Sequence, residues 1–423
     1  MTEGSIQPMA AQREDHWRSY EVYQRMRVRD ATTLIKPRQL SSDAYLTDPF
    51  SLVATLRENY PCYRDWPGNA FWVTRYDDVT SVFTDAANFT SRSAGGVIAG
   101  NDLHYETAIN ACIAQRGDAV IEPVVQRIID NVNSGLNDGR RVDVASEFCA
   151  RLPFEMLAFT LGVSPHEELA GIYLTLRNGS GWEPRSLARA SQGRAALATF
   201  IDAHMIAGDF EPGSLLDIAR NFGAAGVDVA ATVWAMDHQT LHGSLANCLA
   251  LLFSHPTQLE EVRLHRRLVK AAWLEALRHS PPIISIDMFA RHEVERFGRL
   301  LPEGALVRLS SAAANRDPRV FDDPDTFRVG RRDLTLREAR GQFRADGLPS
   351  AVSFGTGTPS KDPALPDDRP RSVFARTRDH AVIAIDSLLT AFPELHLADG
   401  AIASLRSLRL GGLYTCWSLP IVA

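Results

Sequence analysis

The sequence has few cysteines, no long apolar run and no signal for export. Its cysteines, at positions 62, 112, 149, 248 and 416, form no Cys-x-x-Cys pair and no zinc-type spacing with histidine. That pattern argues against a disulfide framework and against a zinc module, so we expect buried free thiols and no metal. No stretch approaches the roughly 20 apolar residues of a membrane span, and Met1 to Asp15 lack the parts of a signal peptide. We therefore expect a cytoplasmic protein with no membrane contact.

The charges are balanced and dispersed. The chain of 423 residues carries 51 acidic and 45 basic side chains, a net charge of −6, and no run of five like charges. A nucleic-acid partner is therefore not expected. The 45% hydrophobic content is typical of a globular protein that can bury a large core. A hydrophobic small molecule, a protein partner or both fit this composition better.

Two regions follow from the pattern along the chain. Residues 1–44 are predicted to form an N-terminal extension, in which Trp17, Tyr20, Tyr23 and the apolar stem of Arg27 recur at helical spacing. Pro37 ends that pattern. Residues 45–423 are predicted to form one domain.

Helical periodicity dominates this domain. Phe71 to Thr74 alternate like a strand, and a helix capped by an aspartate is predicted to follow near Tyr76. Leu241 to Phe253 are apolar almost all round, which predicts a central helix ending before Pro256. Further strands are predicted at 305–310 and 408–422. The fold class is therefore mostly α with a small β component.

The segment 273–331 carries the most specific pattern. It contains Glu275 and Arg278 in Glu-x-x-Arg spacing, then Pro281-Pro282, Asn315-Arg316-Asp317-Pro318 and Arg331. In this order the motifs resemble bacterial cytochromes P-450, and the resemblance extends from Tyr45 to the C-terminus. It implies the cytochrome P-450 fold, with Glu275, Arg278 and Arg331 as a structural lock. Residues three apart share a helix face, and arginine pairs with carboxylate in two bonds.

The chain departs from this family at the positions that hold haem. Where the family has its cysteine loop, residues 354–361 read Phe-Gly-Thr-Gly-Thr-Pro-Ser-Lys, and an irregular loop is predicted at 362–370. The family's propionate-binding segment corresponds to 106–110, where Glu106 replaces a histidine and an alanine replaces an arginine. A later arginine corresponds to Met288. The resemblance therefore implies a haem-free homologue with no cofactor, because a thiolate ligand is what supports oxygen activation in this family.

The family's oxygen-binding segment corresponds to 236–240, with Asp237, His238, Gln239 and Thr240 as candidate catalytic residues. Asp237 and Thr240 would share a helix face, as would His238 and His242. These polar groups either hydrogen-bond in the space used elsewhere for oxygen or contact a ligand. No third metal ligand accompanies the histidines. The acidic run at 322–325 is interpreted as a turn.

Three functions remain open. The first is an auxiliary protein of specialised-metabolite biosynthesis, similar to the haem-free P-450 homologues that bind and activate glycosyltransferases. The second is a non-redox cyclase or isomerase that uses the vacated apolar cavity. The third is a haem monooxygenase with an atypical ligand.

Overall fold

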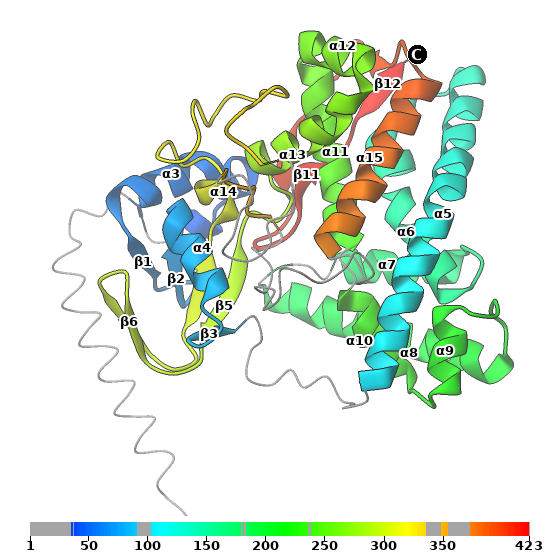
Figure 1. Ribbon diagram of the computed structural model, residues 1–423, viewed down its shortest axis with the longest axis horizontal. Helices are drawn as coiled ribbons and strands as arrows, with labels where there is room; N and C mark the ends of the chain where they lie inside the picture. The colour runs from blue at the N-terminus through cyan, green and yellow to red at the C-terminus, as the bar shows by residue number, and fades with distance from the viewer. Residues whose placement is uncertain are drawn as a thin grey trace, which may run out of the picture.

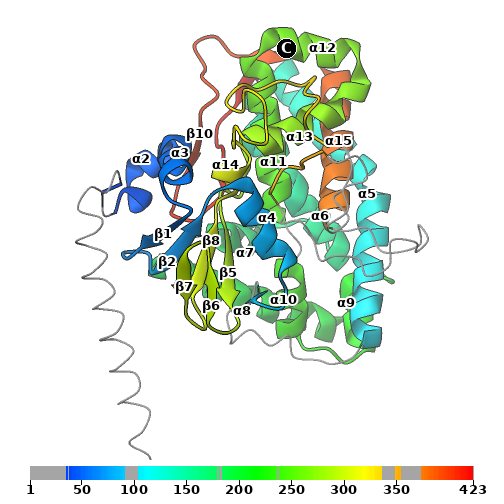
Figure 2. The same ribbon diagram turned by 60° about the vertical axis from the view of Figure 1, so that its left-hand side comes forward.

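The computed structural model describes residues 35–36, 38–90, 103–178, 181, 183–235, 238–335, 348–353 and 373–422. A strand-rich region lies at the left of Figure 1 and a helix-rich region at the right, and Figure 2 shows the same division after a turn of 60°. The helix predicted near Trp17 and the loop predicted at 362–370 lie outside the described residues. Ile35 and Leu40 pack in one cluster with Tyr45, and the domain division at residue 44 stays a prediction.

The strand-rich region is built on a mixed five-stranded sheet. Its strand order is β1 (Cys62–Asp65), β2 (Ala70–Val73), β8 (Leu306–Leu309), β5 (Ile286–Ala290) and β3 (Phe89–Thr90). β2 is parallel to β8, and all four of its residues are buried. Phe71 and Val73 belong to one apolar cluster, and Ala70 and Trp72 to another. Side chains of a strand alternate between faces, so β2 is covered on both sides.

Short helices accompany this sheet: η1 (Gln39–Ser41), α2 (Asp43–Thr47), α3 (Pro49–Asn59), α4 (Tyr76–Thr84) and α14 (Ser311–Ala314). The strand predicted at Phe71 and the helix predicted near Tyr76 are confirmed as β2 and α4. The prediction that a local aspartate caps α4 is wrong, because its N-cap residue, Arg75, makes no side-chain cap bond. The Tyr76 amide instead donates to the Asp317 carboxylate at 3.0 Å, so the cap comes from 241 residues away.

The helix-rich region contains most of the chain between residues 103 and 279, together with one C-terminal helix. Its elements are α5 (Leu103–Asn137), η2 (Ala145–Cys149), α6 (Arg151–Leu161), α7 (Glu167–Asn178), α8 (Pro184–Ala207), α9 (Leu215–Asn221), α10 (Gly226–Ala235), α11 (His238–Ser254), α12 (Pro256–Leu264), η3 (Arg266–Leu268), α13 (Val269–His279) and α15 (Val373–Ala391). None of the described helices is long and apolar enough to cross a membrane.

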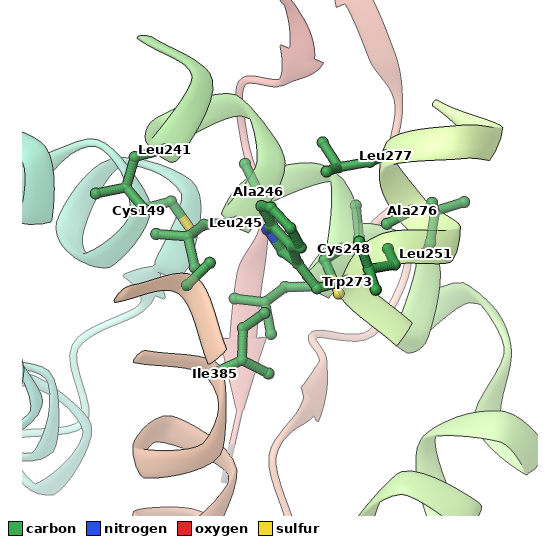
Figure 3. Packing of buried hydrophobic residues seen from close by; sticks show 14 of the residues in the cluster. Cys149, Leu241, Leu245, Ala246, Cys248, Leu251, Trp273, Ala276, Leu277 and Ile385 are labelled. Carbon is green, nitrogen blue, oxygen red and sulfur yellow. The ribbon is translucent and has the colours of Figure 1, made fainter. Parts of the chain in front are cut away.

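The helix α11 lies at the centre of this region, as its composition predicts (Figure 1). Every residue from Thr240 to Phe253 is buried. Figure 3 shows the Trp273 indole of α13 among α11 side chains that include Ala246 and Cys248, with Ile385 of α15 close by. A helix that is apolar on all sides is stable in water only when neighbours surround it. The predicted role of Leu241 to Phe253 as a central helix is therefore confirmed.

Small sheets complete the fold. β4 (Val142–Asp143), β12 (Pro420–Val422) and β9 (His396–Leu397) form one, β10 (Leu405–Ser407) pairs with β11 (Tyr414–Cys416), and β6 (Val294–Arg296) pairs with β7 (Arg299–Leu301). The strands predicted within 305–310 and 408–422 are present as β8, β11 and β12. The predicted class, mostly α with a small β component, is confirmed.

Candidate functional site

A buried carboxylate on α13 organises the centre of the molecule. Glu275 accepts two bonds from Arg278, each at 2.7 Å, and its Oε2 lies 3.1 Å from Nε of Arg331. The side chains of all three residues are at most 1% exposed. The backbone amide of Arg328 donates a further bond to Glu275 at 2.9 Å. Glu275 thus contacts two guanidinium groups and holds the chain near Arg328 on α13, and Arg331 also pairs with Asp333 at 3.1 Å.

The same two arginines also bind backbone carbonyls of the acidic run at 322–325. Arg331 donates to the carbonyls of Asp322 at 2.6 Å and Asp323 at 3.0 Å, and Arg278 donates to that of Pro324 at 2.6 Å. Asp323 adopts a left-handed backbone conformation with φ of 44°, which is unfavourable for most residues. The side chain of Asp322 is 86% exposed. The run is therefore a turn held through its carbonyls.

The chain that enters the segment 354–372 is fixed by Asn315. Its side chain accepts from the Val352 amide at 2.6 Å and donates to the Leu277 carbonyl, at the end of α13, at 3.2 Å. The Tyr76 hydroxyl donates to the Ser350 carbonyl at 2.9 Å. Each of these bonds satisfies a backbone, amide or hydroxyl group that needs a partner when buried. Residues 350–353 are consequently attached to both α13 and α4.

The chain that leaves this segment is also anchored. Phe374, near the start of α15, packs against Trp273 of α13 with ring centroids 5.9 Å apart. Further along α15, His380 lies 3.3 Å from a carboxylate oxygen of Asp118 on α5. The segment 354–372 therefore runs between two attached ends, both of which contact α13.

Of the four candidate catalytic residues, only Thr240 has a described side chain. It is completely buried at the first turn of α11. Asp237 lies outside the described residues, and so do the side chains of His238 and Gln239, although both belong to α11. The structure therefore does not test whether Asp237 shares a face with Thr240. The catalytic role of these residues stays a prediction.

His242, one turn after His238, is 2% exposed and packs edge-on against Trp417 at 5.8 Å. Its Nδ1 makes no hydrogen bond to the described residues. Burial, together with the nearby Arg177 cation, lowers the pKa of His242 to about 3. The imidazole is therefore neutral at physiological pH. Among the described residues no cluster of three metal-ligating side chains is present.

Asn247 is a site residue that sequence reasoning missed. Its amide donates to the Ser280 carbonyl at 2.8 Å and the Tyr414 carbonyl at 3.0 Å, and it accepts from the Cys416 amide at 3.1 Å. One side chain thus joins α11 to the end of α13 and to β11. A polar residue inside an apolar helix was the available signal, because such a group needs partners.

The five cysteines are all buried and free, as predicted. They lie on separate elements: Cys62 on β1, Cys112 on α5, Cys149 in η2, Cys248 on α11 and Cys416 on β11. Burial raises the pKa of the Cys62 thiol to about 12 and that of Cys416 to about 11. Burial also raises the pKa of Cys112, Cys149 and Cys248. Neutral, packed thiols are poor ligands for a metal.

The position expected for a propionate-binding arginine is apolar. Met288 on β5 is 7% exposed and belongs to the main core cluster. The nearby cation, Arg308 of β8, is paired in two bonds with Asp287 at 2.7 and 2.9 Å. Its charge is therefore already compensated. The side chains of 106–110 and all of 354–361 lie outside the described residues.

The arrangement of a central apolar helix, a Glu–Arg–Arg lock and a flanking mixed sheet defines a class of fold. A family model described as Cytochrome P450 matches residues 254–335. Among solved structures, the ligand-free cytochrome P450 TbtJ1 covers 90% of this chain and 99% of its own, with a TM-score of 0.69 and 23% identity. The myxobacterial cytochrome P450 CYP267B1 in complex with myristic acid covers 91% and 98%, with a TM-score of 0.70 and 20% identity.

Curated relatives agree. Cytochrome P450 107B1 of Saccharopolyspora erythraea is 28% identical over 302 residues, 69% of this chain and 67% of the relative. Pulcherriminic acid synthase of Bacillus subtilis is 22% identical over 350 residues, 76% of this chain and 85% of the relative. The chain has the cytochrome P450 fold, and part of its sequence matches the cytochrome P450 family.

Haem is the cofactor that this family implies. A cytochrome P450 holds haem iron through a cysteine thiolate. The segment 354–372, which precedes α15, contains no cysteine, and the nearest ones in sequence are Cys248 and Cys416. Both are buried on α11 and β11. Met288 supplies no cation for a propionate group.

Proposed function

We propose that this protein is a haem-free member of the cytochrome P450 superfamily that acts without oxygen activation. Its proposed role is that of an auxiliary partner of an enzyme in specialised-metabolite biosynthesis, such as a glycosyltransferase. The observation that carries the proposal is the lack of a cysteine between Cys248 and Cys416, which leaves the segment before α15 without sulfur. In this family the cysteine thiolate bound to the haem iron favours cleavage of the O–O bond.

The buried contacts of the fold are retained, which supports the proposal that the protein has a function. Glu275 and Asp333 together pair the charges of Arg278 and Arg331, and Asn315 still holds residues 350–353 on α13. Unpaired buried charges of this kind are strongly destabilising. A chain that retains these contacts retains a defined surface, which is what a protein partner recognises.

The relatives support the metabolic setting. One solved neighbour is the cytochrome P450 PksS of the bacillaene polyketide synthase of Bacillus subtilis. Another, P450BioI, is known in complex with an acyl carrier protein that carries a fatty acid. Members of this fold therefore include proteins that work beside other proteins on small hydrophobic molecules. A hydrophobic ligand, a biosynthetic enzyme or both are proposed as partners of this chain.

The test is an activation assay with a candidate glycosyltransferase of specialised-metabolite biosynthesis. The purified transferase is assayed alone and with increasing amounts of this protein, without reductant and under nitrogen. We expect co-purification of the two proteins and a saturable rise in transferase activity. The matched control replaces this protein with cytochrome P450 107B1, which should give no rise.

Two outcomes would contradict the auxiliary role. One is that the transferase is neither bound nor stimulated. The other is that the isolated protein converts a substrate by itself without reductant, which would make it the non-redox enzyme of the second hypothesis. Conversion that depends on reductant and oxygen would contradict the haem-free account as a whole.

A further inference from the structure

The helices α7 to α10 carry an unusual share of exposed apolar surface. Ten large hydrophobic side chains are exposed in the described part of the chain, and five of them lie between residues 174 and 227. They are Leu174, Leu187, Ile206, Phe222 and Val227. Single exposed apolar residues are normal, whereas a concentration on one unit indicates an interaction surface.

The helix α8 is the longest element of this unit and lies at the edge of the molecule in both views (Figures 1 and 2). Its inner face is buried at Ser186, Ala190, Gly193, Leu197, Phe200 and Ile201. Its outer face is an exposed row that we call the α8 face. This face consists of Ala188, Gln192, Ala195, Thr199, Asp202 and Ile206.

The α8 face is poor in charge for a surface helix. Asp202 is its one ionisable residue, and that carboxylate accepts a bond from the Gly226 amide at 2.7 Å. Ile206 is 87% exposed, and Leu187 beside the face is 58% exposed. Exposed helix faces ordinarily carry charged residues. The row itself therefore carries one carboxylate that is already bonded, and Arg189 is exposed beside it.

Charges of opposite sign stand at its two ends. Arg185 is exposed at the beginning of α8. Asp209, two residues after the helix ends, has a side chain that is 83% exposed, and its carboxylate lies 3.8 Å from Nδ1 of His204. An arginine at one end and a carboxylate at the other make the face complementary to a copy of itself in the antiparallel direction.

We propose that the α8 face is a homodimer interface, in which α8 packs antiparallel against α8 of a second copy about a two-fold axis near Leu197. Successive residues of the α8 face are alternately four and three positions apart. This order is the same in both directions from Leu197. Ala188 then opposes Ile206, Gln192 opposes Asp202, and Ala195 opposes Thr199. Arg185 lies opposite Asp209 of the second copy.

This packing is physically reasonable because the central residues are small. Helices packed through side chains of this size approach to about 8 Å between axes, the short end of the usual range. A two-fold interface is self-complementary by definition, so each contact occurs twice. A partner other than a second copy of this chain would not require Arg185 and Asp209 to carry opposite charges at equal distances from Leu197. The proposal does not depend on the absence of haem.

The experiment is sedimentation velocity of the full-length protein at loading concentrations from about 1 to about 200 µM, a range that covers interfaces of modest strength. We expect a concentration-dependent shift from the monomer mass of 46.7 kDa to twice that mass. The variant Ala195→Glu places like charges close to the axis and should remain monomeric. The matched control is Asn131→Glu, which adds the same charge to an exposed position on α5 and should dimerise like the wild type.

A charge exchange identifies the register. Arg185→Asp and Asp209→Arg should each weaken dimerisation at least tenfold, and the double variant should recover it because the pair is restored with reversed polarity. All variants should keep the far-ultraviolet circular dichroism of the wild type. A wild type that is monomeric at every concentration would overturn the proposal. A dimer that is insensitive to Ala195→Glu, or a double variant that recovers nothing, would overturn it equally.

Discussion

Replacement of Glu275 by glutamine tests the buried lock most severely. The carboxylate accepts from Arg278, from Arg331 and from the Arg328 amide, and its side chain is 1% exposed. Glutamine has nearly the same shape, but it carries no charge and presents an NH2 group to donors. The Arg278 guanidinium would then be buried without a carboxylate partner, whereas Arg331 would keep its pair with Asp333. Removal of one partner from a buried ion pair costs about 3 to 5 kcal/mol.

The assay is equilibrium unfolding in urea, followed by tryptophan fluorescence. The free energy of unfolding of Glu275→Gln should fall by this amount relative to the wild type. Glu260→Gln is the control, because Glu260 pairs with Arg263 on α12 with a side chain that is 60% exposed. An exposed pair of this kind contributes about 0.5 kcal/mol or less. If both variants lose the same small amount, the claim that Glu275 organises the centre is wrong.

Two further variants test neighbouring contacts. Asn247→Ala removes the three hydrogen bonds that join α11 to the end of α13 and to β11. The free energy of unfolding should fall by about 3 kcal/mol. A thermal melt unchanged from the wild type would contradict the role of Asn247. His242→Phe keeps the packing and removes the titration. Because burial lowers the folded pKa of His242 to about 3, the unfolded chain binds the proton first as the pH falls below about 6.5. The wild type should therefore lose stability relative to His242→Phe as the pH falls from 6.5 to 5, with a slope that rises to about 1.4 kcal/mol per pH unit. Urea unfolding measures both slopes, and equal slopes would contradict this prediction.

Local patterns were sufficient to predict most of the fold. The all-round apolar run at 241–253 predicts a central helix because no other environment accepts it, and α11 confirms this. Glu275, Arg278 and Arg331 were predicted as a lock from a motif, and the structure brings their charges together. The family resemblance could identify these residues although Arg331 follows Glu275 by 56 positions.

Contacts between distant segments could not be predicted in this way. The cap of α4 comes from Asp317, and periodicity around Tyr76 contains no information about residues 241 positions away. Asn247 was missed for the same reason, since its partners lie at the end of α13 and on β11. The pairing of Asp287 with Arg308 depends on the register of β5 and β8. Each case requires the sheet and helix packing to be known first.

The haem content of the purified protein tests the central claim most directly. The full chain is expressed with added 5-aminolaevulinic acid, in parallel with cytochrome P450 107B1, and both are examined by visible absorbance and by the pyridine haemochrome reaction. The account predicts a colourless protein with no Soret band, beside a red control with one haem per chain. A stoichiometric porphyrin in this protein would contradict it.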